Sequence, residues 1–272
     1  MTTITVPSTS TSTRIRRTTQ PLSRPTGFLT DTWTVLIREL TPKLRQPASM
    51  LFAMVQPLVF LGLFAPLLPT VESGSALQWF VPGIVVMTAL MGASMTGADL
   101  TAEIRSGSHE RLLVSPLSRP SLLVGRALKE VVPVLFQTVV ILAVVTPFSF
   151  ELHLGGVLVG AVIVSLFAIG MGALSFALAT AAKEQDWVFW TVQQMLIFPL
   201  LLLSGVLLPL DGAPGWLRFL SDINPMTYVV EAERALFAGE FPVDVVAGGF
   251  VAGAAVAVIG VLVGVRTMER SS

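Results

Sequence analysis

Residues 156–181 read GVLVGAVIVSLFAIGMGALSFALATA and contain no charged side chain. A helix needs about 20 mostly apolar residues to cross the hydrocarbon core of a bilayer, so this stretch is long enough to do so. Five more stretches have a similar length and character, at about 49–68, 79–98, 122–148, 187–208 and 245–265, the third with a polar opening turn at Arg126, Lys129 and Glu130. The sequence therefore predicts an all-α membrane protein with six transmembrane helices.

The composition supports this fold class and narrows the function. Hydrophobic residues make up 53% of the 272 residues and charged residues 12%, whereas soluble domains carry roughly 25% charged residues. The net charge of zero gives no support to a nucleic-acid partner. The chain has no cysteine, which excludes disulfides, thiol catalysis and zinc–thiolate sites. Its two histidines, His109 and His153, are too few for a histidine metal cluster.

The basic residues fall almost entirely on one side of the six segments. Of the 17 Lys and Arg residues, only Arg218 and Arg234 lie in the connections on the other side. The rest precede the first span, follow the last span, or lie in the second and fourth connections. Because Lys and Arg are enriched on the cytoplasmic side, this distribution predicts a multi-pass protein of the plasma or inner membrane with both termini in the cytoplasm.

Two segments precede the first span. Residues 1–27 are rich in Ser, Thr, Pro and Arg and have no apolar period, which predicts a disordered basic tail. The alternative is that arginines of this tail contact anionic lipid. In residues 28–45, apolar side chains such as Leu29, Trp33 and Leu40 recur at spacings of three and four. This pattern predicts an amphipathic helix in the membrane interface, bent or ended at Pro42.

Two connections are longer than a helical bundle requires. The cytoplasmic one, residues 99–119, mixes charged and apolar residues, and it fits either short helices that dock on a soluble partner or a solvated loop on the headgroups. The outer one, residues 209–242, predicts two short re-entrant-like helices that begin at Pro214 and Pro225. Within the second of these, Glu231, Glu233 and Arg234 are expected to pair among themselves.

Both connections carry motifs that resemble those of the membrane subunits of the ABC-2 exporter family. The cytoplasmic motif consists of Glu103, Gly107, Glu110, Arg111, Leu112, Ser115, Pro116, Ser118, Arg119, Gly125 and Arg126. The outer motif consists of Ser204, Gly205, Pro209, Pro214, Trp216, Leu217, Asn224, Pro225, Tyr228 and Glu231. The resemblance covers about residues 28–265, and the cytoplasmic motif is most similar to that of the daunorubicin-resistance type of drug and antibiotic exporters.

The resemblance implies a function and a set of partners. Membrane subunits of this family work in pairs, and each pair sits on two separate ATP-binding subunits. Residues 46–266 would form the ABC-2 transmembrane domain, and residues 28–45 the connecting helix. The stretch from Glu103 to Arg119, which includes Arg105, would be the coupling segment that rests in a groove of the ATPase. The partner permease is either a second copy of this chain or a sibling chain.

ATP chemistry is expected in another protein. The sequence contains no Gly-x-x-x-x-Gly-Lys-(Ser/Thr) run, so this chain has no P-loop to hold ATP phosphates. ATP and Mg²⁺ would bind to the partner ATPase, and no catalytic residue, cofactor or metal ligand is expected in this chain.

The substrate route is expected between the second and fifth spans, which line it in the family. Met87 and Met91 lie one helical turn apart on the second span, and Gln193 and Gln194 lie on the fifth. The alternatives are core packing for the methionines and hydrogen bonds between helices for the glutamines. The uncharged spans favour an amphipathic or lipophilic substrate that leaves the cytoplasm or the inner leaflet.

Other functions remain open at this point. One alternative is an exporter of a lipid or a polysaccharide. Two others are a secondary transporter without an ATPase, and a membrane-embedded enzyme or scaffold. The span centres lack charged side chains, which argues against proton-coupled transport. The absence of His-Glu-x-x-His and Gly-x-Ser-x-Gly runs argues against two classes of hydrolase.

Glycines four residues apart occur in two of the predicted spans. They are Gly156 and Gly160 in the fourth span, and two pairs in the sixth, Gly249 with Gly253 and Gly260 with Gly264. Such pairs allow the backbones of two helices to approach closely. We expect these glycines to pack within one chain.

Overall fold

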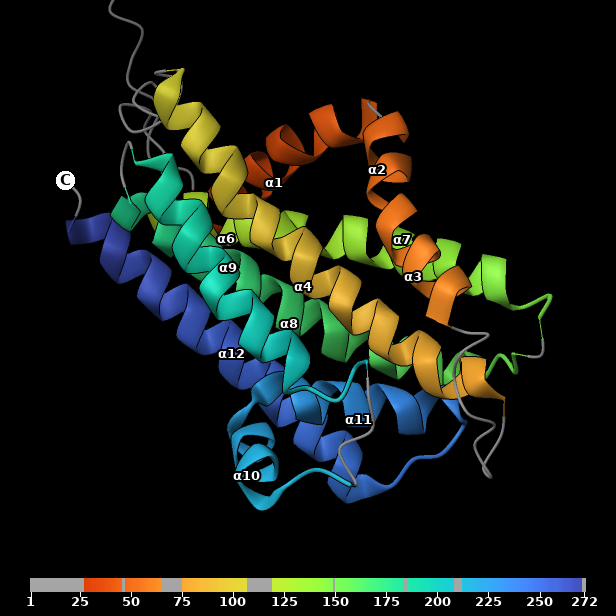
Figure 1. The fold of residues 1–272 in the computed structure, drawn as a ribbon. Coiled ribbons are helices and arrows are strands. Elements are labelled where there is room, and N and C mark those ends of the chain that lie inside the picture. The colour runs from red at the N-terminus through yellow and green to blue at the C-terminus, as the bar shows by residue number, and fades with distance from the viewer. Residues whose placement is uncertain are drawn as a thin grey trace, which may run out of the picture.

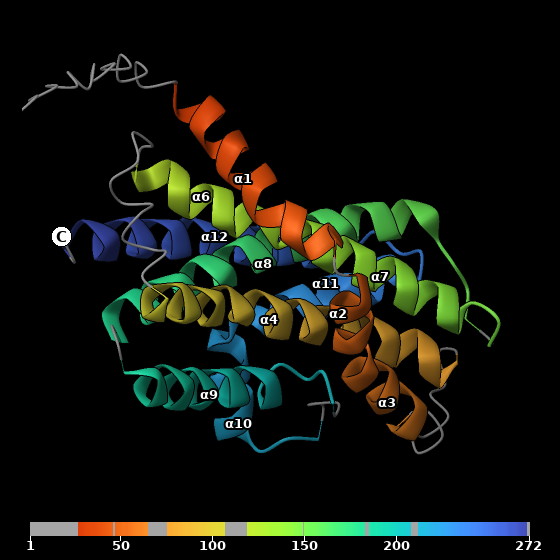
Figure 2. The same ribbon diagram turned by 90° about the horizontal axis from the view of Figure 1, so that it is seen from above.

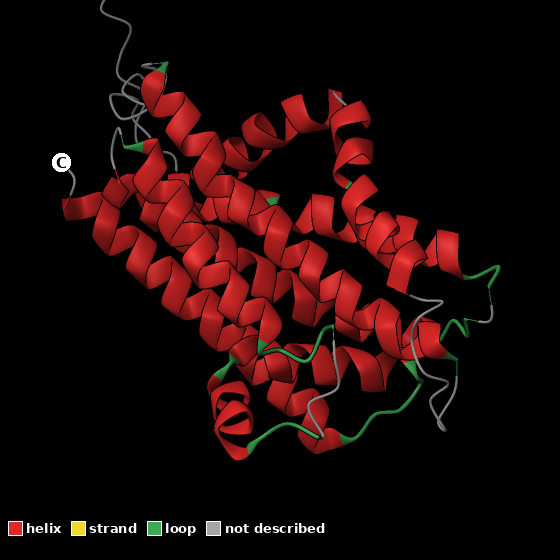
Figure 3. Cartoon of the chain, in the orientation of Figure 1, coloured by secondary structure: helices red, strands yellow, loops and turns green. Residues whose placement is uncertain are grey.

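The computed structural model of the chain describes residues 27–45, 47–64, 75–106, 119–148, 150–182, 185–207 and 212–270. Within these ranges every regular element is a helix, as Figure 3 shows. The helices are α1 (Phe28–Arg45), α2 (Pro47–Ala53), α3 (Val55–Phe64), α4 (Ala76–Arg105), α6 (Arg119–Lys129), α7 (Val131–Val145), α8 (Leu154–Ala182), α9 (Asp186–Leu202), α10 (Gly215–Ile223), α11 (Pro225–Phe237) and α12 (Val243–Arg270).

Four helical stretches are long and apolar enough to cross a membrane. They are α4, α8, α12 and the continuous run from Pro120 to Val145 that contains α6 and α7. These correspond to the predicted spans at 79–98, 156–181, 245–265 and 122–148. The predicted spans at 49–68 and 187–208 correspond to shorter apolar helices, Leu51–Phe64 and Asp186–Leu202. The all-helical membrane class is therefore confirmed, and the count of six spans remains a prediction.

Prolines account for two of the helix breaks. A proline has no N–H to donate to the carbonyl four residues earlier. Pro57 therefore leaves the Ala53 carbonyl without its helical partner, and α2 ends at Ala53. In the same way, Pro133 leaves the Lys129 carbonyl without its helical hydrogen-bond partner, and α6 ends at Lys129. The residue after this second break is Glu130, whose side chain is nearly fully buried.

The bundle is held together by close contact between α8 and α12, which run side by side in Figure 1. A Cβ added at Gly260 would overlap the carbonyl oxygen of Gly170 on α8, and one added at Gly170 would overlap the backbone at Val256. A Cβ at Gly253 would come within 3.1 Å of the Ile163 carbonyl oxygen. The predicted glycine packing within one chain is confirmed, because only glycines allow this approach.

Helix α11 lies across one end of the bundle, packed against α8, α12 and α4, with α10 beside it (Figure 1). A Cβ at Gly156 on α8 would overlap the Leu236 carbonyl, and one at Gly249 on α12 would overlap the Ala232 side chain. The two short helices predicted after Pro214 and Pro225 are both present. Whether they enter the membrane remains a prediction.

Helix α1 has the bounds predicted for the amphipathic segment and crosses α6 in Figure 2. Asp31 and Val35 face the protein and are buried, whereas Leu29 and Trp33 are 80% and 62% exposed. The polar side chains of α1 are therefore not all turned away from the bundle, and much of its apolar side is uncovered. Its location in the membrane interface remains a prediction, and residues 1–26 lie outside the described part of the chain.

Candidate functional site

Charged side chains from three helices meet near the end of α4, at the end of α6 and along the second half of α1. Each helix contributes residues three or four positions apart, which lie on one helix face. We call this group the charge cluster; its members are Glu39 and Lys43 of α1, Asp99 and Glu103 of α4, Arg126 and Lys129 of α6, and Glu130 in the turn after α6.

Lys129 and Glu130 form the buried centre of the charge cluster, at 2% and 1% exposure. The Lys129 Nζ lies 3.0 Å from Asp99 Oδ2 and 3.4 Å from Glu39 Oε2. The Glu130 Oε1 accepts hydrogen bonds from the Lys43 ammonium at 3.1 Å and from the Thr96 hydroxyl at 2.9 Å. These two neighbouring residues therefore bind α1 and α4 at once.

Arg126 joins the same three helices to a fourth. Its guanidinium lies 3.2 Å from Glu39 of α1 and forms an ion pair with Glu103 of α4. It also lies over the Phe176 ring of α8, 5.6 Å from the ring centroid. The preceding Gly125 brings α6 close to α1, since a Cβ there would lie 2.8 Å from the Val35 side chain. Arg126 itself is only 3% exposed.

The charge cluster has a mechanical rather than a catalytic character. A buried ion that loses its partner is strongly destabilising, so the buried Arg126, Lys129 and Glu130 must keep their partners on α1 and α4. Movement of α1, α4 or α6 alone would separate at least one of these pairs. The charge cluster therefore ties the three helices into one unit at this end of the bundle.

The ends of the predicted coupling segment are the part of it that the structure describes. Glu103, near the end of α4, pairs with Arg126 in the last turn of α6, so the chain leaves α4 beside the charge cluster. Arg105 is exposed and pairs with Asp186 in the first turn of α9. Arg119 is the first residue of α6. The predicted residues Gly107, Glu110, Arg111, Ser115 and Pro116 lie outside the described residues.

Sequence reasoning found part of the charge cluster and missed its connections. Arg126 and Glu103 were recognised as members of the cytoplasmic motif, but Arg126, Lys129 and Glu130 were otherwise interpreted as a polar opening turn of a span, and Asp99 as the start of a loop. The signal available in the sequence was the spacing of three or four residues, which places two charged side chains on one helix face next to an apolar run. The pairs with this spacing are Glu39 with Lys43, Asp99 with Glu103, and Arg126 with Lys129. Which faces would meet depended on how α1 folds back onto α6.

The residues predicted to contact substrate have different environments. Met87 is buried in the core and Met91 is partly buried against it. Gln193 is buried, with its Oε1 3.1 Å from Ser175 Oγ, and lines an apolar cavity of about 300 Å³ between α8 and α9. Gln194 is exposed on α9. Their role in a substrate route remains a prediction.

The predicted outer motif builds the turn between α10 and α11. Asn224 caps α11, its Oδ1 accepting the Met226 N–H at 3.0 Å, and its Nδ2 donates to the Leu200 carbonyl at 2.7 Å. Pro225 occupies the first turn of α11, where a missing N–H has no cost. The Tyr228 hydroxyl donates to the Asp222 carbonyl at 2.7 Å. Trp216 is exposed on α10, and Pro209 lies outside the described residues.

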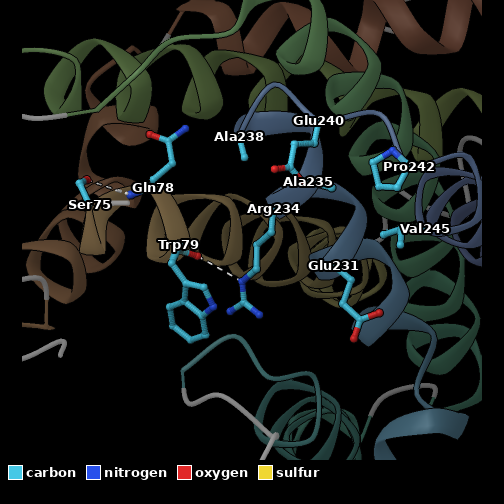
Figure 4. A pocket seen from close by; sticks show the side chains of 10 residues that line it. All are labelled: Ser75, Gln78, Trp79, Glu231, Arg234, Ala235, Ala238, Glu240, Pro242 and Val245. Atoms are coloured by element: carbon cyan, nitrogen blue, oxygen red, sulfur yellow. Dashed lines mark hydrogen bonds between the residues drawn. The ribbon is translucent and has the colours of Figure 1, made fainter. Parts of the chain in front are cut away.

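A second polar region lies at the α11 end of the bundle (Figure 4). The Arg234 guanidinium lies 3.8 Å from the Trp79 ring centroid and donates to the carbonyls of Trp79 and Gly205 at 3.2 and 2.7 Å. It borders a cavity of about 430 Å³ that Gln78 and Glu240 also line. The expected pairing of Glu233 with Glu231 or Arg234 is wrong: its carboxyl is buried and has no hydrogen-bond partner among the described residues.

Comparison with known proteins places the chain in a family. Residues 30–238 match the family described as ABC-2 type transporter. The chain is 28% identical over 198 residues to the daunorubicin resistance ABC transporter permease protein DrrB1 of Streptomyces coeruleorubidus, covering 71% of this chain and 70% of that protein. It is 32% identical over 212 residues to the putative transport permease ycf38 of Cyanophora paradoxa, covering 75% and 73%.

A third relative has a similar extent. The chain is 26% identical over 223 residues to the probable doxorubicin resistance ABC transporter permease protein DrrC of Mycobacterium tuberculosis (strain CDC 1551 / Oshkosh), covering 78% of each. The motifs around Glu103–Arg119 and Ser204–Glu231 had indicated the same group of membrane subunits. The chain belongs to the ABC-2 type transporter family of membrane permeases.

Proposed function

We propose that this chain is the transmembrane subunit of an ATP-driven exporter that moves an amphipathic or lipophilic, drug-like molecule out of the cytoplasm or the inner leaflet. In this proposal the chain crosses the membrane six times, with both termini in the cytoplasm. It pairs with a second permease chain and with two separate ATP-binding subunits, which hold ATP and Mg²⁺.

The charge cluster is the observation that carries this proposal. It lies where the coupling segment leaves α4 and at the far end of α6, the helix that follows that segment, and it fixes α1 to both helices. A force on the coupling segment would therefore act on α1, α4 and α6 together. Arg126, Lys129 and Glu130 of the charge cluster are buried, so separating them from their partners on α1 and α4 is costly.

The mechanical sequence follows from this connection. Closure of the two ATPase subunits on ATP would displace the coupling segment, with α1 resting on the same subunits. The charge cluster would pass that displacement to α4 and α6, and the stretch that runs from α6 through the break at Glu130 into α7 would carry it across the membrane. ATP hydrolysis would then release the ATPases and return the helices.

The substrate class is inferred from the described spans and from the relatives. The cavity beside Gln193 is lined by Met171, Leu174 and other apolar side chains, with few polar atoms. Two relatives are named for resistance to daunorubicin and doxorubicin. Both observations favour an amphipathic or lipophilic molecule, with Gln193 and Gln194 as candidate contacts on α9 and Met87 and Met91 on α4.

Charge reversal in the coupling segment tests the proposal. This chain would be co-expressed with its partner P-loop ATPase, and Glu110→Lys with Arg111→Glu would be compared with the wild type. We expect the double variant to lose co-purification of the ATPase, or to lose substrate-stimulated ATP hydrolysis in the assembled complex. The control is Glu269→Lys with Arg270→Glu, at the exposed end of α12. Unchanged assembly and unchanged stimulation would overturn the assignment of the coupling segment.

A further inference from the structure

Glu233 is a buried acidic residue that the proposed transport mechanism does not use. It lies on α11, outside the four helical stretches long enough to span a membrane, and its exposure is 0%. Neither carboxyl oxygen has a hydrogen-bond partner among the described residues. Buried polar groups are nearly always paired, so an unpaired carboxyl in this position requires an explanation.

The carboxyl of Glu233 is pressed against a glycine of α8. A Cβ added at Gly160 would overlap the Glu233 carboxyl oxygens, so the side chain fills the space that the glycine leaves. One turn earlier, Gly156 receives the backbone of α11 at Leu236. The contact between α11 and α8, which we call the seat of α11, therefore includes two glycines and one acidic side chain.

Among the residues that the structure describes, no ionised group compensates the Glu233 carboxyl in this seat. Burial is the only cause that raises the pKa of Glu233, to about 8, and no charged neighbour contributes. The titratable groups on and beside the packed elements are Glu151 and His153 before α8, Asp99, Glu103 and Arg105 on α4, Arg218 and Asp222 on α10, Tyr228, Glu231 and Arg234 on α11, Glu240 after it, and Asp244, Arg266, Glu269 and Arg270 on α12.

We propose that Glu233 is a proton-dependent contact: its uncharged carboxyl lets α11 seat on α8, and loss of the proton releases α11 from the Gly160 face. A carboxylate without a partner is far costlier to bury than a neutral carboxyl. The ionised form therefore favours an arrangement in which the side chain reaches water. Because Asn224 and Pro225 begin α11 right after α10, both short helices would move together.

The direction of the pH dependence follows from proton linkage. The seated form binds the proton more tightly than the released form, whose carboxyl resembles an ordinary glutamate. Release of α11 therefore becomes about tenfold more favourable for each pH unit between the two pKa values, and levels off above about 8. This inference concerns packing alone, so it stands or falls independently of the transported substrate.

Amide hydrogen exchange of the purified full-length chain in nanodiscs tests the proposal. After correction for intrinsic exchange, we expect the protection of α11 amides in the wild type to fall about tenfold per unit between pH 5.5 and 7.5. We expect α11 at pH 8 to exchange faster than the middle of α12. Glu233→Leu and Glu233→Gln remove the titrating carboxyl, and both should abolish the pH dependence of α11 protection. His153 is unchanged in both variants. Glu240→Gln, an exposed carboxyl just after α11, should behave as the wild type.

Three results would overturn the proposal. The first is the same pH trend in Glu233→Leu as in the wild type. The second is equal protection of α11 and α12 at pH 8, which would mean that the whole chain opens rather than α11. The third is failure of both uncharged variants to fold at pH 7 while the wild type folds, because the seat would then depend on the carboxylate.

Discussion

Removal of Arg126 tests whether the charge cluster holds three helices together. Arg126→Met keeps the length of an apolar stem but removes the guanidinium from between Glu39 and Glu103. Loss of one member of a fully buried ion pair costs about 3–5 kcal/mol. The stacking on Phe176 adds about 0.5–2 kcal/mol to the loss.

The two carboxylates left behind are not equally stranded, and this reduces the cost. The Glu39 side chain is 11% exposed and keeps Lys129 at 3.4 Å, whereas the Glu103 side chain is 25% exposed and can reach water. We therefore expect Arg126→Met to lower the free energy of unfolding by about 2–4 kcal/mol. Arg126→Lys should recover only part of this, because an ammonium lacks the two-pronged geometry of a guanidinium.

The assay is SDS titration of the purified chain in mixed micelles, with helix content as the signal. Arg266→Met on α12 is the matched control, since Arg266 is exposed and does not belong to the charge cluster. A double-mutant cycle of Arg126→Met with Glu103→Gln should give a coupling energy within about 0.5–3 kcal/mol. If Arg126→Met loses no more stability than Arg266→Met, the charge cluster does not hold these helices and the mechanical argument fails.

Three further predictions concern other parts of the fold. Gly260→Ala forces a Cβ onto the Gly170 carbonyl and should destabilise the chain by about 1–3 kcal/mol in the same titration. The control is Gly62→Ala on α3, where a Cβ meets nothing, and this change should be neutral or stabilising. Asn224→Ala removes the cap of α11 and should cost about 1 kcal/mol, seen as faster hydrogen exchange in the first turn of α11. Because burial raises the pKa of Glu233, the free energy of unfolding should fall as pH rises from about 5 to 8, by up to about 1.4 kcal/mol per pH unit. Unfolding of Glu233→Leu, measured at each pH, should lack this contribution to the pH dependence.

The sequence allowed the long helices to be predicted because their signal is local. Each apolar run such as 156–181 extends over a full membrane thickness, and the glycine spacing on it indicated close packing before any partner was known. The boundaries of α11 were predictable for a similar reason. Asn224 and Pro225 are a capping residue followed by a residue that suits the first helical turn.

The candidate site was less predictable because it depends on contacts distant in sequence. Lys43 meets Glu130 across 87 positions of the chain, and nothing local in either segment identifies the partner. The pairing expected for Glu233 was wrong for the opposite reason. Proximity in sequence to Arg234 suggested an ion pair, but consecutive residues on a helix point in different directions, and Arg234 turns to Trp79.

The most direct test of the central claim is substrate uptake into proteoliposomes under three conditions. The first condition contains this permease with its ATPase and ATP. The second contains the same complex with an ATPase variant that binds ATP but does not hydrolyse it. The third contains the permease alone under a proton gradient. A panel of amphipathic dyes and antibiotics supplies the substrates. We predict uptake in the first condition only, lost again when Arg126→Met is introduced into the permease. Uptake by the permease alone under the proton gradient would contradict the account, because the energy would then not come from a separate ATPase.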